Sequence, residues 1–232
     1  MSATACRLVP HGSCRATTAP VRVDHHVVIA YEHARELQRA HARARAAGTG
    51  PDVLMLLEHP TVYTAGKRTR PEDRPTDGTP VVEVDRGGRI TWHGPGQLVG
   101  YPVLALRDAL AVGGYVARLE AALVAACDEL GVVGAHRVAG RPGVWLPAAH
   151  GASASKIAAI GVRVENGITQ HGFALNCDAD LEAFSRIVPC GLSDAGVTSL
   201  TAATGRRIGV ADIRDVVART VLDAIDRDCP DA

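Results

Sequence analysis

Aromatic residues are scarce in this sequence of 232 residues, where phenylalanine, tyrosine and tryptophan together account for 3%. Proteins that bind single-stranded nucleic acid stack bases on aromatic side chains, and membrane proteins carry aromatic belts, so neither class is favoured. Long hydrophobic runs are also missing. The longest, residues 53–57 and 121–127, fall far short of the ~18 residues that a membrane span needs.

An excess of charge is missing as well, because 25 lysines and arginines balance 25 aspartates and glutamates. This balance argues against a protein that acts mainly on nucleic acid or on an anionic membrane. A hydrophobic content of 47% is enough for a packed core in a chain of this length. The sequence therefore predicts a soluble globular protein.

No apolar stretch separates Arg7 from Arg15 near the N-terminus, so the sequence does not predict a secretory signal peptide. The six cysteines are irregularly spaced in a chain that is long enough to fold without disulfides. We therefore expect a cytoplasmic protein with reduced thiols, and no cysteine spacing in it predicts a metal site.

Lysine is nearly absent: of the 25 basic residues, only Lys67 and Lys156 are lysines. An arginine serves wherever a positive charge is enough, but only a lysine can release a proton near neutral pH and act as a base. Both lysines are therefore candidates for chemistry, with chance survival in an arginine-rich sequence as the alternative.

The order of patterns predicts an α/β (α+β) fold with a mixed sheet and flanking helices. Residues 1–20 have no periodicity and are expected to form a flexible tail, whereas residues 21–232 show no repeat or boundary and read as a single domain. Helices are predicted at 31–47, 114–130 and 210–227, with shorter helical segments at 179–186 and 198–203. Strands are predicted at 52–58, 61–64, 81–84, 89–92, 98–106, 143–146, 157–164 and 168–176.

The last two predicted strands are separated by Asn166 and Gly167, a two-residue turn of the type I′ kind that fixes the register of a hairpin. Opposed residues then have numbers that add up to 333. The register pairs Ala159 with Ala174, Ile160 with Phe173, and Gly161 with Gly172. Two facing glycines leave room for a ligand chain to lie close to the strands.

Residues 85–101 concentrate five glycines around two predicted strands. A loop with so few side chains exposes backbone N–H groups that suit a carbonyl, a phosphate or an acyl chain. Its spacing matches neither a P-loop nor a dinucleotide-binding motif. The alternative is a tight hairpin in which His93 is hydrogen-bonded internally.

Two thiols are candidates for a reactive group. Cys190 lies between a proline and a glycine, in a constrained loop that can expose a thiol. Cys177 lies opposite Lys156 in the predicted register. Spacing does not decide between them, and either could be a small buried hydrophobic residue.

Four motifs, in this order, resemble the lipoyl(octanoyl) transferase family: RGGRITWHGPGQ at 86–97, SKIAAIG at 155–161, HGFALN at 171–176 and PCG at 189–191. The resemblance covers residues 27–220. It implies the fold of the biotin and lipoate protein ligase catalytic domain, a mixed β-sheet with flanking helices.

The resemblance also implies the roles of individual residues. The family's nucleophile lies in its Pro-Cys-Gly motif, so Cys190 is the implied nucleophile, and the lysine that assists it corresponds to Lys156. The chain departs from many members in having Trp92 where they have tyrosine or phenylalanine. The acyl-binding segments correspond to Arg86, Gly87, Gly88, Arg89, Ile90, Thr91, Trp92 and His93, to Ala159, Ile160 and Gly161, and to Gly172, Phe173 and Ala174.

The implied activity is transfer of an octanoyl group from octanoyl-acyl carrier protein, through a cysteine thioester, to the lysine of a lipoyl domain. The implied acceptors are the lipoyl domains of 2-oxoacid dehydrogenases and the glycine cleavage H protein, and neither a metal nor a cofactor is expected. Two docking patches for an acidic carrier are open: Lys67, Arg68, Arg70 and Arg74, or the arginines of residues 35–45.

Two other functions compete with this one. An ATP-dependent lipoate or biotin protein ligase of the same fold needs a phosphate-binding loop, but the motif at His93 carries no lysine. A non-catalytic carrier-binding protein would leave Lys156 and Cys190 together unexplained.

Overall fold

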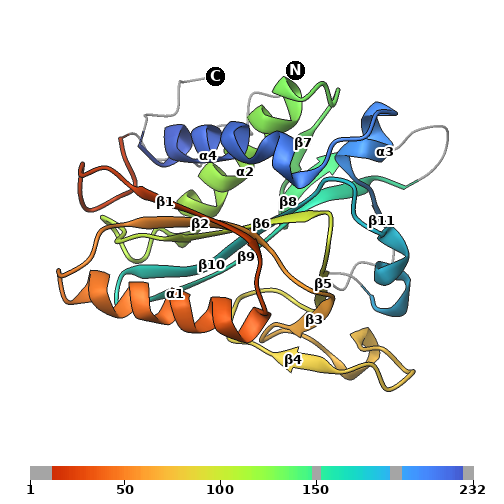
Figure 1. Cartoon of the computed structure of the whole chain (residues 1–232), viewed down its shortest axis with the longest axis horizontal. Coiled ribbons are helices and arrows are strands. Elements are labelled where there is room, and N and C mark those ends of the chain that lie inside the picture. Colours follow the sequence, from red (N-terminus) through yellow and green to blue (C-terminus); the bar gives the residue numbers. More distant parts are fainter. Residues whose placement is uncertain (1–11, 148–152, 189–194, 227–232) are drawn as a thin grey trace.

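The computed structural model describes residues 12–147, 153–188 and 195–226, and we refer to these as the described residues. A large mixed sheet of eight strands forms the centre of the fold, in the order β1-β2-β6-β10-β9-β8-β7, with β11 paired to β9 (Figure 1). These strands are β1 (Arg22–Val28), β2 (Val53–Glu58), β6 (Gln97–Val103), β7 (His136–Val138), β8 (Arg141–Leu146), β9 (Ser155–Glu165), β10 (Ile168–Asn176) and β11 (Gly196–Val197).

Helices cover both faces of this sheet. Helices α2 (Val112–Glu129) and α4 (Val210–Asp226) pack together on one face, and α1 (Tyr31–Ala46) lies on the other (Figure 1). Side chains of β2 alternate between the two layers, because Leu54 and Leu56 join the core under α2 and α4 while Met55 joins the core under α1. The predicted α/β class, a mixed sheet with flanking helices, is confirmed.

A second sheet of three strands lies beside the first, in the order β4-β3-β5. It consists of β3 (Val62–Ala65), β4 (Val81–Glu83) and β5 (Thr91–His93). The remaining helical segments are η1 (Pro71–Asp73), η2 (Leu181–Arg186) and α3 (Leu200–Thr204). Residues 84–90 connect β4 to β5, and we call them the glycine loop.

The predicted hairpin register is confirmed. Strands β9 and β10 are antiparallel, with Gly161 opposite Gly172 and Ala159 opposite Ala174. Asn166 and Gly167 both have positive φ angles, 51° and 76°, as a type I′ turn requires. The ladder ends at the pair of Leu175 with Ala158. The predicted pairing of Cys177 with Lys156 across the hairpin is therefore wrong.

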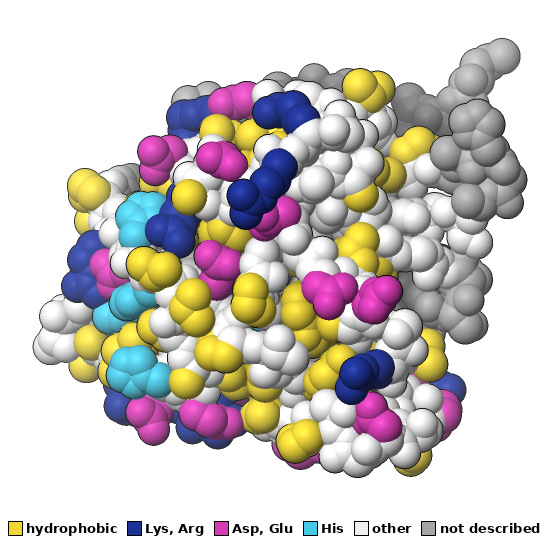
Figure 2. Space-filling view, turned by 45° about the vertical axis from the view of Figure 1, so that its right-hand side comes forward, with side chains coloured by type: hydrophobic (Ala, Val, Ile, Leu, Met, Phe, Trp, Pro, Cys, Tyr) yellow, Lys and Arg dark blue, Asp and Glu magenta, His cyan; other side chains and the backbone are white. Residues whose placement is uncertain are grey.

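The surface agrees with the neutral composition. On the face seen in Figure 2, acidic and basic side chains are interspersed, and neither sign covers a continuous area. No helix among the described residues is long and apolar enough to cross a bilayer.

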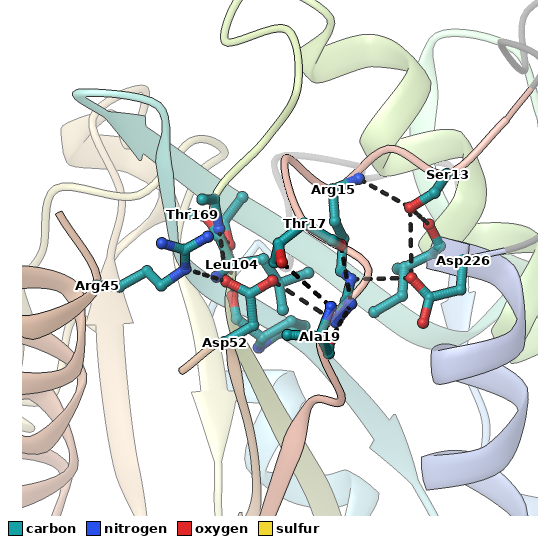
Figure 3. Close-up of polar contacts among 12 residues, drawn as sticks. Ser13, Arg15, Thr17, Ala19, Arg45, Asp52, Leu104, Thr169 and Asp226 are labelled. Atoms are coloured by element: carbon teal, nitrogen blue, oxygen red, sulfur yellow. Dashed lines mark hydrogen bonds and ion pairs between the residues drawn. The ribbon is translucent and has the colours of Figure 1, made fainter. Parts of the chain in front are cut away.

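Residues 12–20 differ from the flexible tail predicted for residues 1–20, because they pack against the sheet and α4. Arg15 is only 2% exposed and forms ion pairs with Asp52 at 3.6 Å and with Asp226 at 2.8 Å (Figure 3). The Cys14 amide donates to the carbonyl of Ile225 in α4. Residues 1–11 lie outside the described residues.

Asp52 holds several parts of the fold together at this point (Figure 3). Its carboxylate is 2% exposed and accepts hydrogen bonds from Arg45 Nε of α1 at 2.6 Å and from the Ala105 amide at 3.0 Å. Removing one partner of a buried ion pair leaves the other charge without compensation, which costs more than the pair itself contributes.

We expect Asp52→Ala to lower the free energy of unfolding by about 3 kcal/mol, because the buried Arg15 loses one of its two carboxylates and the buried Ala105 amide loses its acceptor. Urea denaturation measures this loss. The matched control is Asp24→Ala, which removes the bidentate partner of the half-exposed Arg22 and should cost less than about 1 kcal/mol. Equal losses in the two variants would contradict the role given to Asp52.

Candidate active site

A cavity of about 410 Å³ lies over β9 and β10, with the glycine loop among its walls. Most of the residues that the sequence predicted for the site line this cavity together: Lys156, Arg86, Gly88, Arg89, Thr91, His93, Ala159, Ile160, Gly161, Gly172, Phe173 and Ala174. Segments that are far apart in the sequence therefore meet at one place.

Three predicted residues do not line the cavity. Ile90 and Trp92 are buried and pack with Tyr63 and Phe184 in a separate hydrophobic cluster. Gly87 is used within the fold, since its amide donates to the carbonyl of Val162 at 3.0 Å. This bond fastens the glycine loop to β9.

The paired glycines do not leave the free space that the sequence suggested. A Cβ atom at Gly172 would lie 2.1 Å from the carbonyl oxygen of Gly100 in β6. At Gly161 it would lie 3.0 Å from the carbonyl oxygen of Gly87. Backbone atoms of the protein therefore fill the space beside both glycines, and a bulky side chain at Gly172 would disturb the sheet itself.

Arg86 braces the glycine loop from within. Its guanidinium is almost fully buried and donates to the carbonyl oxygens of Gly87, Arg89 and Thr64 at 2.7–3.0 Å, and to the Thr64 hydroxyl at 2.9 Å. A guanidinium carries five donors in a fixed plane and can hold several carbonyls at once. Arg86 thus shapes the cavity wall that it lines.

Lys156 reaches the cavity from a distorted part of the sheet. The register of β8 and β9 shifts between Val144 and Trp145, as in a β-bulge, which re-aims side chains. Gly143, beside the shift, has a φ of 125°, and a Cβ there would lie 2.3 Å from the carbonyl oxygen of Ala158 and 3.4 Å from Lys156 Cε. Only glycine fits this position.

The ammonium group of Lys156 is held by two neutral groups. Nζ donates to the carbonyl oxygen of Pro142 at 3.0 Å and lies 4.7 Å from the centre of the Trp145 ring. The residue is 9% exposed, and no carboxylate among the described residues pairs with it. Among the described residues, two of its three N–H donors have no hydrogen-bond acceptor.

His93 belongs to a chain of buried hydrogen bonds. The sequence analysis gave an internally hydrogen-bonded His93 as the alternative, but it did not identify the partners. Asn176 Nδ2 donates to the carbonyl of Thr198, Gln97 Nε2 donates to Asn176 Oδ1 at 2.9 Å, and Gln97 Oε1 then accepts from His93 Nδ1 at 2.7 Å. Burial, with the nearby His59, lowers the pKa of His93 to about 3. The imidazole is neutral, and its Nε2 is the unprotonated nitrogen.

A second buried pair lies beside it. His59 Nδ1 is 2.8 Å from the carbonyl of Ile29, and Nε2 is 2.8 Å from the hydroxyl of Tyr101, which lines the cavity. Burial lowers the pKa of His59 to about 4, so Nδ1 donates and Nε2 accepts the hydroxyl proton of Tyr101. No local sequence signal predicts this pair, because His59 directly follows β2 and Tyr101 lies in β6.

Asp85 and His171 connect the glycine loop to β10. His171 Nε2 lies 2.8 Å from Asp85 Oδ1, and Arg163 pairs with the same carboxylate. His171 has a φ of 57°, which is rare for a residue with a side chain, so the surroundings hold the backbone in this conformation. Its place in the HGFALN motif was the available signal.

Of the two candidate thiols, Cys177 belongs to the described residues. Cys177 is fully buried in the core under α2 and α4, where burial strongly raises the pKa of its thiol, and it does not line the cavity. A thiol in this environment is inert. Cys190 lies outside the described residues.

Metal-ligating side chains do not cluster in the described part of the chain: no group of three or more histidines, cysteines, aspartates or glutamates there could hold an ion. Positively charged side chains line the cavity instead. Arg68, Arg70 and Arg141 line it in addition to Arg86, Arg89 and Lys156, and no aspartate or glutamate of the described residues does.

Comparisons with known proteins agree with this geometry. The family model described as "Lipoyl protein ligase A/B catalytic domain" matches residues 30–222. The chain is 58% identical over 218 residues to an octanoyltransferase of Mycolicibacterium smegmatis, covering 94% of this chain and 95% of that protein. It is 54% identical to an octanoyltransferase of Nocardia farcinica, over 94% of this chain and 87% of that one.

Among solved structures, the chain resembles a bipartite lipoate protein ligase of Thermoplasma acidophilum with a TM-score of 0.65 at 15% identity, covering 88% of this chain and 83% of that one. It also resembles a lipoate-protein ligase A bound with ATP, with a TM-score of 0.56 at 15% identity over 88% and 84% of the two chains. At these identities the likeness concerns the fold.

Proposed function

The chain belongs to the lipoyl protein ligase A/B catalytic-domain family and is an octanoyltransferase of protein lipoylation, and from this premise we propose that it works through a thioester on Cys190 with Lys156 as the base. The observation that carries the proposal is the setting of Lys156. It is a nearly buried amine without a carboxylate partner among the described residues, in a cavity lined by the predicted acyl-binding segments.

The first half-reaction loads the enzyme. The amine of Lys156 takes the thiol proton of Cys190, and the thiolate attacks the carbonyl carbon of the octanoyl thioester. The bond from that carbon to the donor's sulfur breaks, and the donor thiolate leaves with the proton that Lys156 held. Exchange of one thioester for another needs no ATP and no metal, because the donor is already activated.

The second half-reaction transfers the octanoyl group to nitrogen. The amine of the acceptor lysine attacks the thioester on Cys190, and Lys156 accepts the proton that this nitrogen must lose. The bond to the Cys190 sulfur breaks, the thiolate takes that proton from Lys156, and an amide is formed. Both halves require a group at position 156 that gains and releases a proton.

Octanoyl-acyl carrier protein is the proposed donor. The proposed acceptors are the lipoyl domains of 2-oxoacid dehydrogenases and the glycine cleavage H protein. The proposal includes the cytoplasmic location that the sequence predicted. The competing ligase and carrier-binding functions lose support, since the relatives named above, at 58% and 54% identity, are octanoyltransferases.

The structure bears on where an acidic carrier would dock. Arg68 and Arg70 are exposed and line the cavity, next to the exposed Lys67. Arg70 also lies 3.6 Å from Glu72. In the α1 row, Arg35 pairs with Glu32 at 2.7 Å and Arg45 with the buried Asp52, and the arginines of this row do not line the cavity. Charge complementarity at the cavity mouth therefore favours residues 67–70 as the docking patch.

We expect the protein, incubated with octanoyl-acyl carrier protein alone, to gain one octanoyl mass that hydroxylamine removes, because the adduct is a thioester. Peptide mass spectrometry should locate it on Cys190, and Cys190→Ser should gain none. The matched control is Cys177→Ala, which should still load. An adduct on Cys177 would refute the assignment of the nucleophile.

Lys156→Arg should be nearly as inactive as Lys156→Ala, with loading and transfer both at least ~100-fold slower than in the wild type, because an arginine stays protonated and cannot act as a base. Single-turnover rates of each half-reaction test this. Lys67→Arg, the same change at the other lysine, is the control and should leave the chemical steps intact. A Lys156→Arg variant close to the wild-type rate would eliminate the base role.

Arg68→Gln combined with Arg70→Gln should raise the KM for octanoyl-acyl carrier protein roughly three- to tenfold, since each exposed charge contributes modestly to docking. The KM for octanoyl-N-acetylcysteamine, which has no carrier, should not change. Arg39→Gln with Arg43→Gln removes the same charge from exposed positions of α1 and serves as the control. A larger effect of the α1 pair would assign docking to that helix instead.

A further inference from the structure

Trp145 is one of only two tryptophans in the chain, and it is buried against Lys156. The two residues lie opposite each other in the register of β8 and β9. Nζ of Lys156 is 4.7 Å from the centre of the ring, within the distance at which an ammonium is attracted to the electron-rich face. The indole N–H donates to the carbonyl of Arg141 at 2.9 Å, which fixes the ring's orientation.

A nearly buried ammonium needs electrostatic compensation, and the usual source is a carboxylate. Glu120 of α2 reaches the same bulge, but its oxygens accept from Arg137 Nε at 2.8 Å and from the Gly143 amide at 3.0 Å. Among the described residues, compensation for Lys156 therefore comes from the Pro142 carbonyl and the Trp145 ring.

Arginines add positive charge near the ring. The guanidinium of Arg141 lies 5.9 Å from the same ring centre, and Arg68, Arg70, Arg86 and Arg89 line the cavity. They disfavour a further positive charge at Lys156. The face of the Trp145 ring has the opposite effect, because it attracts the ammonium.

We propose that Trp145 is a positioning residue that acts through Lys156: its ring face holds the ammonium in place and stabilises it. The consequence for catalysis rests on the proposed function. In the proton transfer from the Cys190 thiol to the Lys156 amine, the products are a thiolate and an ammonium, and the ring favours that side. More of the nucleophile is then ionised.

An aromatic face suits this role better than a carboxylate. A carboxylate would accept one or two hydrogen bonds from the ammonium. It would then compete with the Cys190 thiolate for the same N–H groups. The ring stabilises the cation through its quadrupole and leaves two N–H donors for the reacting groups. It also has no proton of its own to exchange with the thiol.

The two-lysine sequence makes a direct test possible. In protein with 13C-labelled lysine, Lys67→Arg leaves a single Cε signal, that of Lys156, and its titration can be followed without substrate. Tryptophan is then replaced by 5-fluoro-, difluoro- and tetrafluorotryptophan in a Trp92→Phe background, so that only position 145 is labelled. Fluorines weaken the ring quadrupole and hardly change its shape.

We expect the pH at which the Lys156 signal titrates to fall with each added fluorine, by roughly half a pH unit to one and a half units over the series. Trp145→Phe should lie between the wild type and Trp145→Leu. Both of these variants lose the hydrogen bond to Arg141, so their difference reports the ring face alone. The proposal would be overturned if fluorination left the titration midpoint of the Lys156 signal unchanged, or if the phenylalanine and leucine variants had the same midpoint.

The rate of octanoyl loading separates this proposal from the proposed function. If Lys156 is the base, the pH profile of loading on Cys190 moves with the NMR titration across the fluorinated series. In another outcome, the NMR titration midpoint shifts across the fluorinated series but the pH profile of loading does not. This result supports the contact between Trp145 and Lys156 and refutes the catalytic role of Lys156.

Discussion

The close approach of the glycine loop to β9 is the constraint on which the site depends. The amide of Gly87 donates to Val162, and a single added carbon at Gly161 would crowd the Gly87 carbonyl. Arg86 fills the inside of the loop with hydrogen bonds to its carbonyls, and Asp85 ties its base to His171. The loop thereby becomes a rigid wall of the cavity, as a site that must orient an acyl group requires.

Local signals made the sheet side of the site predictable from the sequence. The Asn166-Gly167 turn determines the register of β9 and β10, and that register brings Ala159 and Ala174 together. The same reasoning misjudged the space beside Gly161 and Gly172, because the atoms that fill it belong to residues more than sixty positions away along the chain. Register predicts which residues face each other and says nothing about what packs above them.

Long-range polar contacts account for the other differences. Residues 12–20 have no periodicity, yet Arg15 is buried because its partners, Asp52 and Asp226, are supplied by distant segments. The chain from His93 to Asn176 and the pair of His59 with Tyr101 join separate segments in the same way. Such contacts leave no pattern in the local sequence. The scarcity of lysine, in contrast, is a property of the whole sequence, and it identifies Lys156 as a candidate without knowledge of its contacts.

Burial makes the nearby histidines poorly suited to move protons in this cavity. His93 lines the cavity and His59 contacts its ring, and both are neutral at physiological pH, so each has one unprotonated nitrogen. A pKa of about 3 or 4, however, makes an imidazole a very weak base, with little tendency to take a proton from a thiol or an amine. The same burial that holds these rings as hydrogen-bond acceptors removes them from acid–base chemistry. The proposed base, Lys156, lies instead where the sheet bulges, and its ammonium contacts the Trp145 ring and the Pro142 carbonyl, whereas the imidazoles serve to shape the cavity.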